Sequence, residues 1–271
     1  MTFAPQPRPA AAAPLPMRVV SIPRLAQGGR WRVEAMRALS EPVLLWFTRG
    51  QGRITVAGLT RGYGGHNAVF IPAGTMHGFE AGPGVLGSAV FFGRTPAHPL
   101  PARPLHLRLR DAARQAEFTA LLDSLRAETE SSRPGRERAA ALYLGLIGVW
   151  LERNAAQADA APADAARRLA QRFTDLIEAE FRTGAGVAAF AERLGVTPTH
   201  LTRVCRQTCG RSALGLLHDR RLFEARRLLH DTRLPVKDVA SSLGFTSAAY
   251  FTRAFQHATG QTPSDFRARR P

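Results

Sequence analysis

Short apolar runs separated by glycine- and proline-rich turns fill the first third of the chain. The runs include VLLWF at 43–47, ITVAG at 54–58, AVFIP at 68–72 and GSAVFF at 87–92. Turn sequences such as TRGQG and AGPG lie between them. Short strands that alternate with turns at close intervals are typical of a β-sandwich or β-barrel. We therefore predict a β domain over residues 17–110.

From residue 111 onward the apolar positions recur at helical spacing. The first series is Phe118, Leu121, Leu122 and Leu125, and after a break at Pro134 and Gly135 the second is Leu142, Leu146, Val149 and Trp150. This spacing predicts two antiparallel helices over residues 111–154. Their apolar stripe either packs onto the β domain or forms a dimer interface, and the pattern favours neither.

Two stretches lack any apolar periodicity. Residues 1–16 contain five prolines and no leucine-rich core, which predicts a flexible tail and argues against a signal peptide. Residues 155–164 are small and polar and include Pro162, so we interpret them as an interdomain linker. The longest apolar run, at 139–151, is too short to span a bilayer. We therefore expect a cytoplasmic protein without membrane contact.

The last hundred residues contain one helical unit twice. The matching segments are VAAFAERLGV (187–196) with VKDVASSLGF (236–245), then LTR (201–203) with FTR (251–253), and Gly210 with Gly260. Gly195 and Gly244 occupy the same place in the two copies, where the first helix ends and the chain turns in a left-handed conformation. Each copy is therefore predicted to be a helix–turn–helix, whose second helix enters the major groove of DNA.

The helix between the copies and the second copy carry a further set of diagnostic residues. They are Arg221, Leu222, Ala225, Leu228, Leu229, the segment 236–245, Phe251, Arg253, Phe255, Gly260 and the closing GQTPSDFR at 260–267. This set resembles the DNA-binding domain of the AraC/XylS family of bacterial transcription regulators. The resemblance covers roughly residues 165–270. It implies a DNA-binding domain over 165–271, with double-stranded DNA and RNA polymerase as partners.

By this resemblance, the outward residues of the two second helices contact DNA. They are Thr199, His200, Thr202, Arg203 and Arg206 in the first helix, and Ser247, Ala248, Ala249, Tyr250, Thr252 and Arg253 in the second. Alanine offers bases only a contact with the thymine methyl group, so we expect the first helix to read bases and the second mainly to hold the backbone. Cys205 aligns with Phe255, which predicts a buried, inert thiol, with a redox switch involving Cys209 as the alternative.

The charge of the chain fits a nucleic-acid partner. Lysine and arginine number 37 against 21 acidic residues, the net charge is +16, and Lys237 is the only lysine. Arginine is the better residue for bidentate contacts with phosphates and base edges. Residues 1–110 hold 13 arginines and 3 glutamates. This excess fits either an anionic effector or arginines that face solvent.

The sequence PAGTMH at 72–77 has the spacing P-x-G-x-x-H. It resembles the second conserved motif of the cupin barrel, which AraC-like regulators commonly carry as an effector-binding domain. The resemblance implies a small-molecule effector bound among inward strand residues. The candidates are Trp46, Phe70, His77 and Phe79. Cupin enzymes bind a metal with this histidine and an H-x-H sequence, which is absent here, so we expect neither metal nor cofactor.

These observations predict an α+β multidomain chain: a cupin-like β-barrel, helices, and then an all-α domain with two helix–turn–helix motifs. The expected function is a sequence-specific transcription regulator, more an activator than a repressor, that works as a homodimer under the control of an effector in the barrel. A metal-dependent cupin enzyme fused to a DNA-binding domain is the alternative. An alkyl-transfer repair regulator would need four cysteines in a zinc module, and the chain has two.

Overall fold

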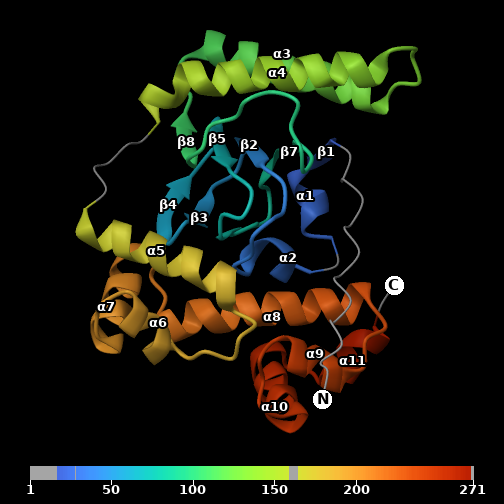
Figure 1. Ribbon diagram of the computed structural model, residues 1–271. Helices are drawn as coiled ribbons and strands as arrows, with labels where there is room; N and C mark the ends of the chain where they lie inside the picture. The colour runs from blue at the N-terminus through green and yellow to red at the C-terminus, as the bar shows by residue number, and fades with distance from the viewer. Residues whose placement is uncertain (1–16, 28, 159–163, 270–271) are drawn as a thin grey trace, which may run out of the picture.

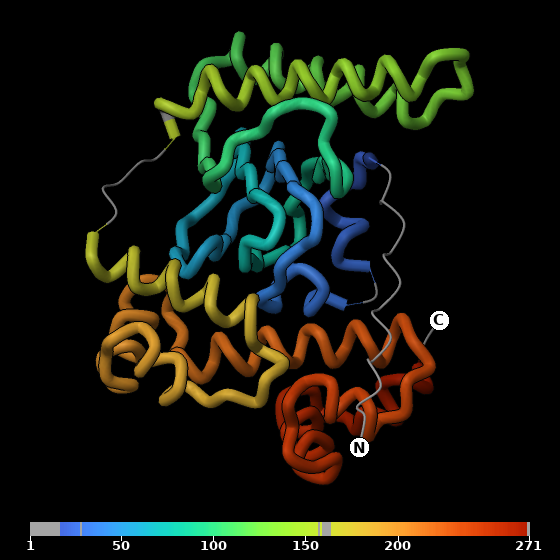
Figure 2. Tube along the Cα trace, viewed as in Figure 1, coloured from blue at the N-terminus to red at the C-terminus, as the bar shows by residue number. Residues whose placement is uncertain are grey.

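The computed structural model describes residues 17–27, 29–158 and 164–269 (Figure 1). The predicted tail at 1–16 and residues 159–163 of the predicted linker lie outside the described residues. The described elements form three layers, with β-sheets in the middle, a helical hairpin on one side and the C-terminal helices on the other (Figure 2). None of the described helices is long and apolar enough to cross a membrane.

The strands form two antiparallel sheets. They are β1 (Arg18–Ser21), β2 (Val43–Arg49), β3 (Gly52–Val56), β4 (Leu59–Tyr63), β5 (Asn67–Ile71), β6 (His77–Phe79), β7 (Leu86–Phe91) and β8 (Leu105–Arg108). One sheet has the order β1-β7-β2-β5-β8 and the other β4-β3-β6. The predicted β region is therefore present, but its strands pair as two open sheets and not as a closed barrel. Among the residues that the structure describes, the outer edge of the short β6 pairs through one isolated bridge, between Arg37 and His77.

Two short helices, α1 (Ile22–Leu25) and α2 (Trp31–Glu34), interrupt the predicted run of strands. Pro23 stands in the first turn of α1, where its missing N–H costs nothing. Helix α2 lies between the sheets and the C-terminal helices, as Figure 1 shows. The strand pattern gave no signal for either helix.

Both faces of the five-stranded sheet are buried. Val43, Leu45 and Phe47 of β2 pack with residues of the three-stranded sheet, so the space between the sheets is filled by side chains. The alternate residues Leu44 and Trp46 pack against the helical hairpin. A strand buried on both faces reads as a continuous apolar run, which explains the sequence VLLWF.

The helical hairpin consists of α3 (Ala112–Glu130) and α4 (Arg136–Asn154), followed by the 3₁₀ helix η1 (Ala155–Gln157). Phe118 and Trp150 stack at 4.0 Å between ring centroids and join the two helices over the sheet. Leu142, Leu146 and Val149 remain 59%, 52% and 41% exposed. The predicted apolar stripe is therefore divided between packing on the sheet and a face open to solvent.

The C-terminal helices pack around a core of their own. They are α5 (Ala165–Glu180), α6 (Val187–Arg193), α7 (Pro198–Cys209), α8 (Ala213–Asp231), α9 (Val236–Ser242), α10 (Ala248–Thr259) and α11 (Pro263–Ala268). Phe173, Phe190 and Phe251 are among its fully buried side chains. Helix α8 spans the group, with α6 and α7 near its start and α9 to α11 near its end (Figure 1).

Candidate DNA-binding surface

The turns of the two repeated units have the same geometry. Gly195 and Gly244 adopt left-handed conformations, with φ of 71° and 73°. The next residue in each copy, Val196 or Phe245, donates its backbone N–H to an alanine carbonyl five positions back, at 3.0 and 3.1 Å. This is the bond of a Schellman helix ending, which glycine allows because it has no Cβ to clash. The predicted repeat is confirmed in this detail.

The second helix of each unit begins with a side-chain cap. The Thr197 hydroxyl accepts the backbone N–H of His200 at 3.2 Å, and the Ser247 hydroxyl accepts that of Tyr250 at 3.1 Å. Such caps satisfy free N–H groups in the first turn. Leu201 of α7 and Phe251 of α10 are fully buried. The caps and these apolar anchors fix which side of each helix faces solvent.

The residues predicted to contact DNA lie on the solvent side of α7 and α10. Thr202 and Thr252 are half-buried, and the other nine are exposed: Thr199, His200, Arg203, Arg206, Ser247, Ala248, Ala249, Tyr250 and Arg253. The five residues of α7 form one surface, because Thr199, Thr202, Arg203 and Arg206 line a single open hollow of about 410 Å³ and His200 lies beside Arg203.

The exposed arginines of α7 and α10 are available to a ligand. In the part of the chain that the structure describes, Arg206 and Arg253 have no ion-pair partner. Arg203 makes only a local contact, from Nη2 to Nδ1 of the exposed His200 at 3.0 Å. An exposed guanidinium without a carboxylate partner is suited to phosphates and base edges. Ala248 and Ala249 occupy the first turn of α10. The difference in base readout between the two helices stays a prediction.

The two cysteines lie on the buried side of α7, inside the core. Both are buried, and the Cys209 thiol donates to the Cys205 carbonyl at 3.0 Å. Burial raises the pKa of Cys205 to about 12 and also raises the pKa of Cys209. Neither thiol forms a reactive thiolate near neutral pH. The predicted burial of Cys205 is confirmed.

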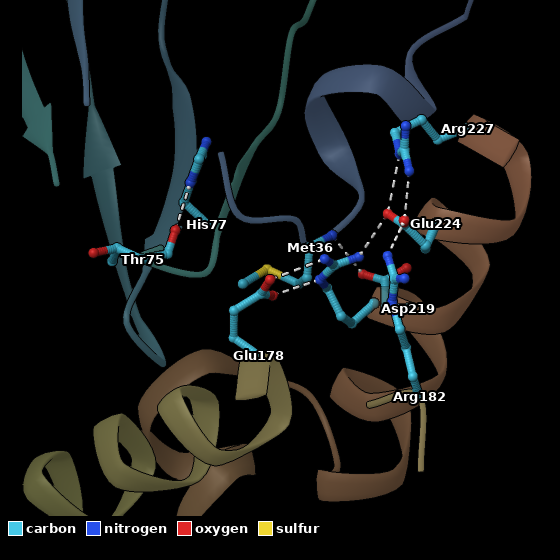
Figure 3. A network of polar contacts seen from close by, with 9 residues as sticks. Met36, Thr75, His77, Glu178, Arg182, Asp219, Glu224 and Arg227 are labelled. Atoms are coloured by element: carbon cyan, nitrogen blue, oxygen red, sulfur yellow. Dashed lines mark hydrogen bonds and ion pairs between the residues drawn. The ribbon is translucent and has the colours of Figure 1, made fainter. Parts of the chain in front are cut away.

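A buried ionic network holds α5 against α8. Arg220 is 4% exposed and forms ion pairs with Glu178 at 2.6 Å and Glu224 at 3.4 Å. Glu224 also pairs with Arg182 at 2.5 Å and Arg227 at 2.7 Å (Figure 3). Burial alone raises the pKa of Glu224, but these arginines lower it on balance. The network holds α5 and α8 together, and α7 packs against both of these helices.

Sequence reasoning missed this network, although the spacing of Arg220 and Glu224, one helical turn apart, is a usable signal.

The β region, residues 18–108, contacts the C-terminal helices directly. The backbone N–H of Met36 donates to Asp219 of α8 at 3.1 Å (Figure 3), and the Met36 side chain lies in the core of the C-terminal helices. The Trp31 ring lies 5.7 Å from that of Phe223 and 6.0 Å from that of Phe266. No sequence pattern predicted this interface.

The four predicted effector residues do not line one cavity. Trp46 and Phe70 pack with the helical hairpin. Phe79 packs between the sheets, on the opposite side of the five-stranded sheet. Successive side chains of a strand point to opposite faces of the sheet. Trp46 therefore points to the hairpin, and its neighbour Phe47 points to the side where Phe79 lies.

His77 is fully buried, and its Nδ1 donates to the Thr75 carbonyl at 2.9 Å (Figure 3). Burial, and then the charge of Arg37, lowers the pKa of His77 to about 3. The imidazole is therefore neutral. Within the described residues, no three side chains of histidine, cysteine, aspartate or glutamate are grouped in a way that could hold a metal ion.

The comparisons with known proteins agree with this geometry. A helix-turn-helix domain family matches residues 190–269. The arabinose operon regulatory proteins of Salmonella typhimurium and Escherichia coli are 38% identical to this chain over 82 residues. Residues 190–269 form a helix-turn-helix domain of the AraC family. The match spans 30% of this chain and under a third of those relatives, 29% and 28%.

Other relatives extend beyond the AraC-family domain. The transcriptional activator RhaR of Shigella dysenteriae is 25% identical over 175 residues, which is 65% of this chain and 62% of RhaR. Among solved structures, the C-terminal domain of the response regulator AraT from Geobacillus stearothermophilus is 33% identical, covers 39% of this chain and 84% of its own, and has a TM-score of 0.35. ToxT from Vibrio cholerae is 11% identical over 93% of this chain and 96% of its own, with a TM-score of 0.39.

Proposed function

We propose that this protein is a sequence-specific DNA-binding transcription regulator. The observation that carries the proposal is the pair of capped helices, α7 and α10, that present exposed arginines at the two ends of α8. Helix α8 has 19 residues, about 28 Å at 1.5 Å per residue. This length is close to one turn of DNA, roughly 34 Å, so the two helices suit successive major grooves on one face of the duplex.

The β region is proposed to bind a small-molecule effector and to control the DNA-binding helices. The direct contact between Met36 and Asp219 supports this part, since a change in the β region reaches α8 without a flexible connection. The motif at 72–77 supports a cupin-like origin of the two sheets. We propose activation through RNA polymerase, in keeping with the resemblance of this chain to regulators that include the named activator RhaR.

The open face of α4 is proposed to form a homodimer. Leu142, Leu146 and Val149 present a continuous apolar surface, one to two helical turns long. Exposed large apolar groups that lie together on one helix are typical of protein–protein contacts. Two copies joined in this way would bring four recognition helices to one operator.

Selection from random double-stranded DNA tests the central proposal. The full-length protein should enrich a sequence with two parts about 10 base pairs apart. It should bind that sequence about 1,000-fold more tightly than scrambled DNA at physiological salt. Arg49→Ala, on β2, removes one positive charge from an exposed position outside the recognition helices. As a control for the loss of charge, this variant should enrich the same sequence as the wild type. A protein that enriches no sequence and binds all DNA equally is not a sequence-specific regulator.

A further inference from the structure

His200 and Arg203 contact each other on the exposed side of α7. The Nη2 atom of Arg203 lies 3.0 Å from Nδ1 of His200. A guanidinium has N–H donors and no acceptor, so the imidazole nitrogen accepts this hydrogen bond. Nδ1 therefore carries no proton, and the neutral ring has its proton on Nε2. The contact thus fixes both the orientation of Arg203 and the tautomer of His200.

The pair stands on a fixed backbone and faces solvent. The Thr197 hydroxyl holds the backbone N–H of His200 at 3.2 Å, and both His200 and Arg203 are exposed. Among the described residues, neither side chain makes a further hydrogen bond or an ion pair. The Nε2–H of His200 and the other N–H groups of Arg203 are therefore available to DNA.

The second helix–turn–helix unit lacks this pair. Tyr250 and Arg253 stand at the equivalent positions of α10, and within the described residues no hydrogen bond joins them. The Tyr250 ring packs instead near Phe245, at 6.0 Å between ring centroids. The contact between His200 and Arg203 is therefore a feature of α7 and not of the repeated unit.

The spacing of the two residues suits adjacent base pairs. The first residues of a recognition helix contact base edges in the major groove, and His200 and Arg203 both lie in the first half of α7. Three residues of an α-helix rise about 4.5 Å. This rise is close to the separation of neighbouring base pairs, roughly 3.4 Å.

Both groups are hydrogen-bond donors, and this property selects the bases that they contact. Guanine presents two acceptors to the major groove, N7 and O6, and arginine contacts both at once. Adenine also presents N7, whereas cytosine presents a donor and thymine places a methyl group beside its O4. A single N–H, such as that of His200 Nε2, therefore favours the N7 of a purine.

We propose that His200 and Arg203 read two adjacent base pairs as one unit. His200 orients Arg203 onto a guanine and donates from its own Nε2 to N7 of the neighbouring purine. This assignment rests on the function proposed above, because it names the DNA sequence that α7 recognises. His200 is then both a contact residue and the positioning residue for Arg203.

Two amide variants of the full-length protein separate these roles. His200→Asn keeps an acceptor near the place of Nδ1 and removes the donor at Nε2, whereas His200→Gln keeps a donor near Nε2 and removes the acceptor. In selection from random double-stranded DNA, His200→Asn should retain the guanine preference and lose the purine preference. His200→Gln should do the reverse. Each loss should be about 5-fold in discrimination, the effect of one hydrogen bond.

A modified base tests the second contact directly. Replacing the neighbouring purine by its 7-deaza analogue removes N7 and leaves the rest of the base edge intact. The replacement should weaken binding of the wild type about 5-fold and leave binding of His200→Asn unchanged. His98→Ala, at an exposed histidine between β7 and β8, is the control and should behave as the wild type in both experiments.

The pair is also testable without DNA. In the ¹⁵N-histidine-labelled protein, the ring signals lost in His200→Asn are those of His200, one of eight histidines. They should show the proton on Nε2 in the wild type and a mixture of tautomers in Arg203→Ala. A proton on Nδ1 in the wild type overturns the proposal.

The remaining outcomes distinguish this proposal from the regulator function. The reading unit is wrong if both amide variants lose the same base preference, or if the 7-deaza base leaves wild-type binding unchanged because Nε2 contacts a phosphate. Circular dichroism checks that each variant folds. A full-length protein that enriches no sequence contradicts the regulator function, whereas the tautomer of His200 still reports on its contact with Arg203.

Discussion

The backbone N–H of Met36 donates a 3.1 Å hydrogen bond to the carboxylate of Asp219 on α8. Met36 comes from the β region and Asp219 from the helix that joins the two helix–turn–helix units. A backbone donor has no rotamer freedom, so the bond fixes where the β region sits on α8. The Trp31 ring reinforces this position against Phe223 and Phe266. The recognition helices are thereby held at a defined place relative to the β region.

Trp31→Ala should lower the free energy of unfolding of the full-length protein by about 2 kcal/mol, because two aromatic contacts and a half-buried ring are lost. Urea denaturation measures the change. Trp31→Phe keeps an aromatic ring and should lose less than half as much. An unchanged stability in Trp31→Ala means that the interface contributes nothing to the folded state.

His77 predicts a pH dependence of stability. Burial lowers its pKa to about 3, whereas an imidazole in the unfolded chain titrates near 6.5. Between pH 6.5 and pH 3 the unfolded state therefore binds up to one proton more than the folded state. The free energy of unfolding should fall by about 1.4 kcal/mol per pH unit as the pH drops. The contribution of His77 is complete above pH 6.5 and is lost progressively toward pH 3.

Urea denaturation between pH 7.5 and pH 5 measures this slope, with His77→Gln as the matched variant. The difference between wild type and His77→Gln should be constant above pH 7 and should shrink below pH 6.5. The pKa of His218 is also lowered by burial, but His218 is present in both proteins and cancels in the difference. Parallel curves over the whole range contradict the prediction.

The helix–turn–helix repeat was predictable because its signals are local. Gly195 and Gly244 mark left-handed helix ends, and Thr197 and Ser247 mark helix starts, whatever the rest of the chain does. Each of these signals depends on a few neighbouring residues, so it occurs at the same position in both copies. The exposed sides of α7 and α10 follow directly from them.

The arrangement of the predicted effector residues was not predictable in the same way. In the run VLLWF every residue is buried, so the sequence carries no sign of which face meets the other sheet and which meets α3. Trp46 packs on the hairpin side of the sheet, whereas Phe79, another predicted effector residue, packs on the opposite side. Arg126 and Ser88 line the same hollow as Trp46. Long-range packing brings them together, and such packing leaves no local pattern in the sequence.

Leu146→Glu should convert a dimeric protein to a monomer. Leu146 is 52% exposed in the middle of the open face of α4, so a glutamate there is solvated in the monomer but buried in a dimer. Sedimentation velocity at micromolar concentration measures the change. Leu86→Glu, which alters a similarly exposed leucine on β7, is the control. A wild type that sediments as a monomer removes the proposed interface.

Residues 164–271 should fold and bind DNA without the β region. Their core is continuous through α5, α7, α8 and α10. Among the described residues outside this fragment, Met36 and Met76 are buried in that core and Trp31 packs against Phe266 at its edge. The fragment should therefore be less stable than the same helices in the full-length protein, yet retain their helical content. Circular dichroism and a DNA-binding titration at low salt measure both. A folded fragment that does not bind DNA places the DNA-binding function elsewhere.

Arg203 and Arg253 occupy equivalent places in the two units, but their neighbours differ. Arg203 lies among Thr199, Thr202 and Arg206, which are able to hydrogen-bond to base edges. Arg253 lies on α10, whose first turn carries Ala248 and Ala249. We therefore expect α7 to read sequence and α10 mainly to hold the phosphate backbone.

Arg203→Ala should relax the sequence preference at its half-site, because a bidentate contact of arginine with guanine contributes about 1–3 kcal/mol of discrimination. Arg253→Ala should weaken binding to all sequences alike and reduce the salt dependence of log Kd by about one unit, because it removes a phosphate contact. Both variants lose one positive charge from equivalent positions, so each is the control for the other. Selection from random DNA, with titrations at several salt concentrations, distinguishes the two effects. The assignment is reversed if Arg253→Ala changes the preferred sequence while Arg203→Ala leaves it intact.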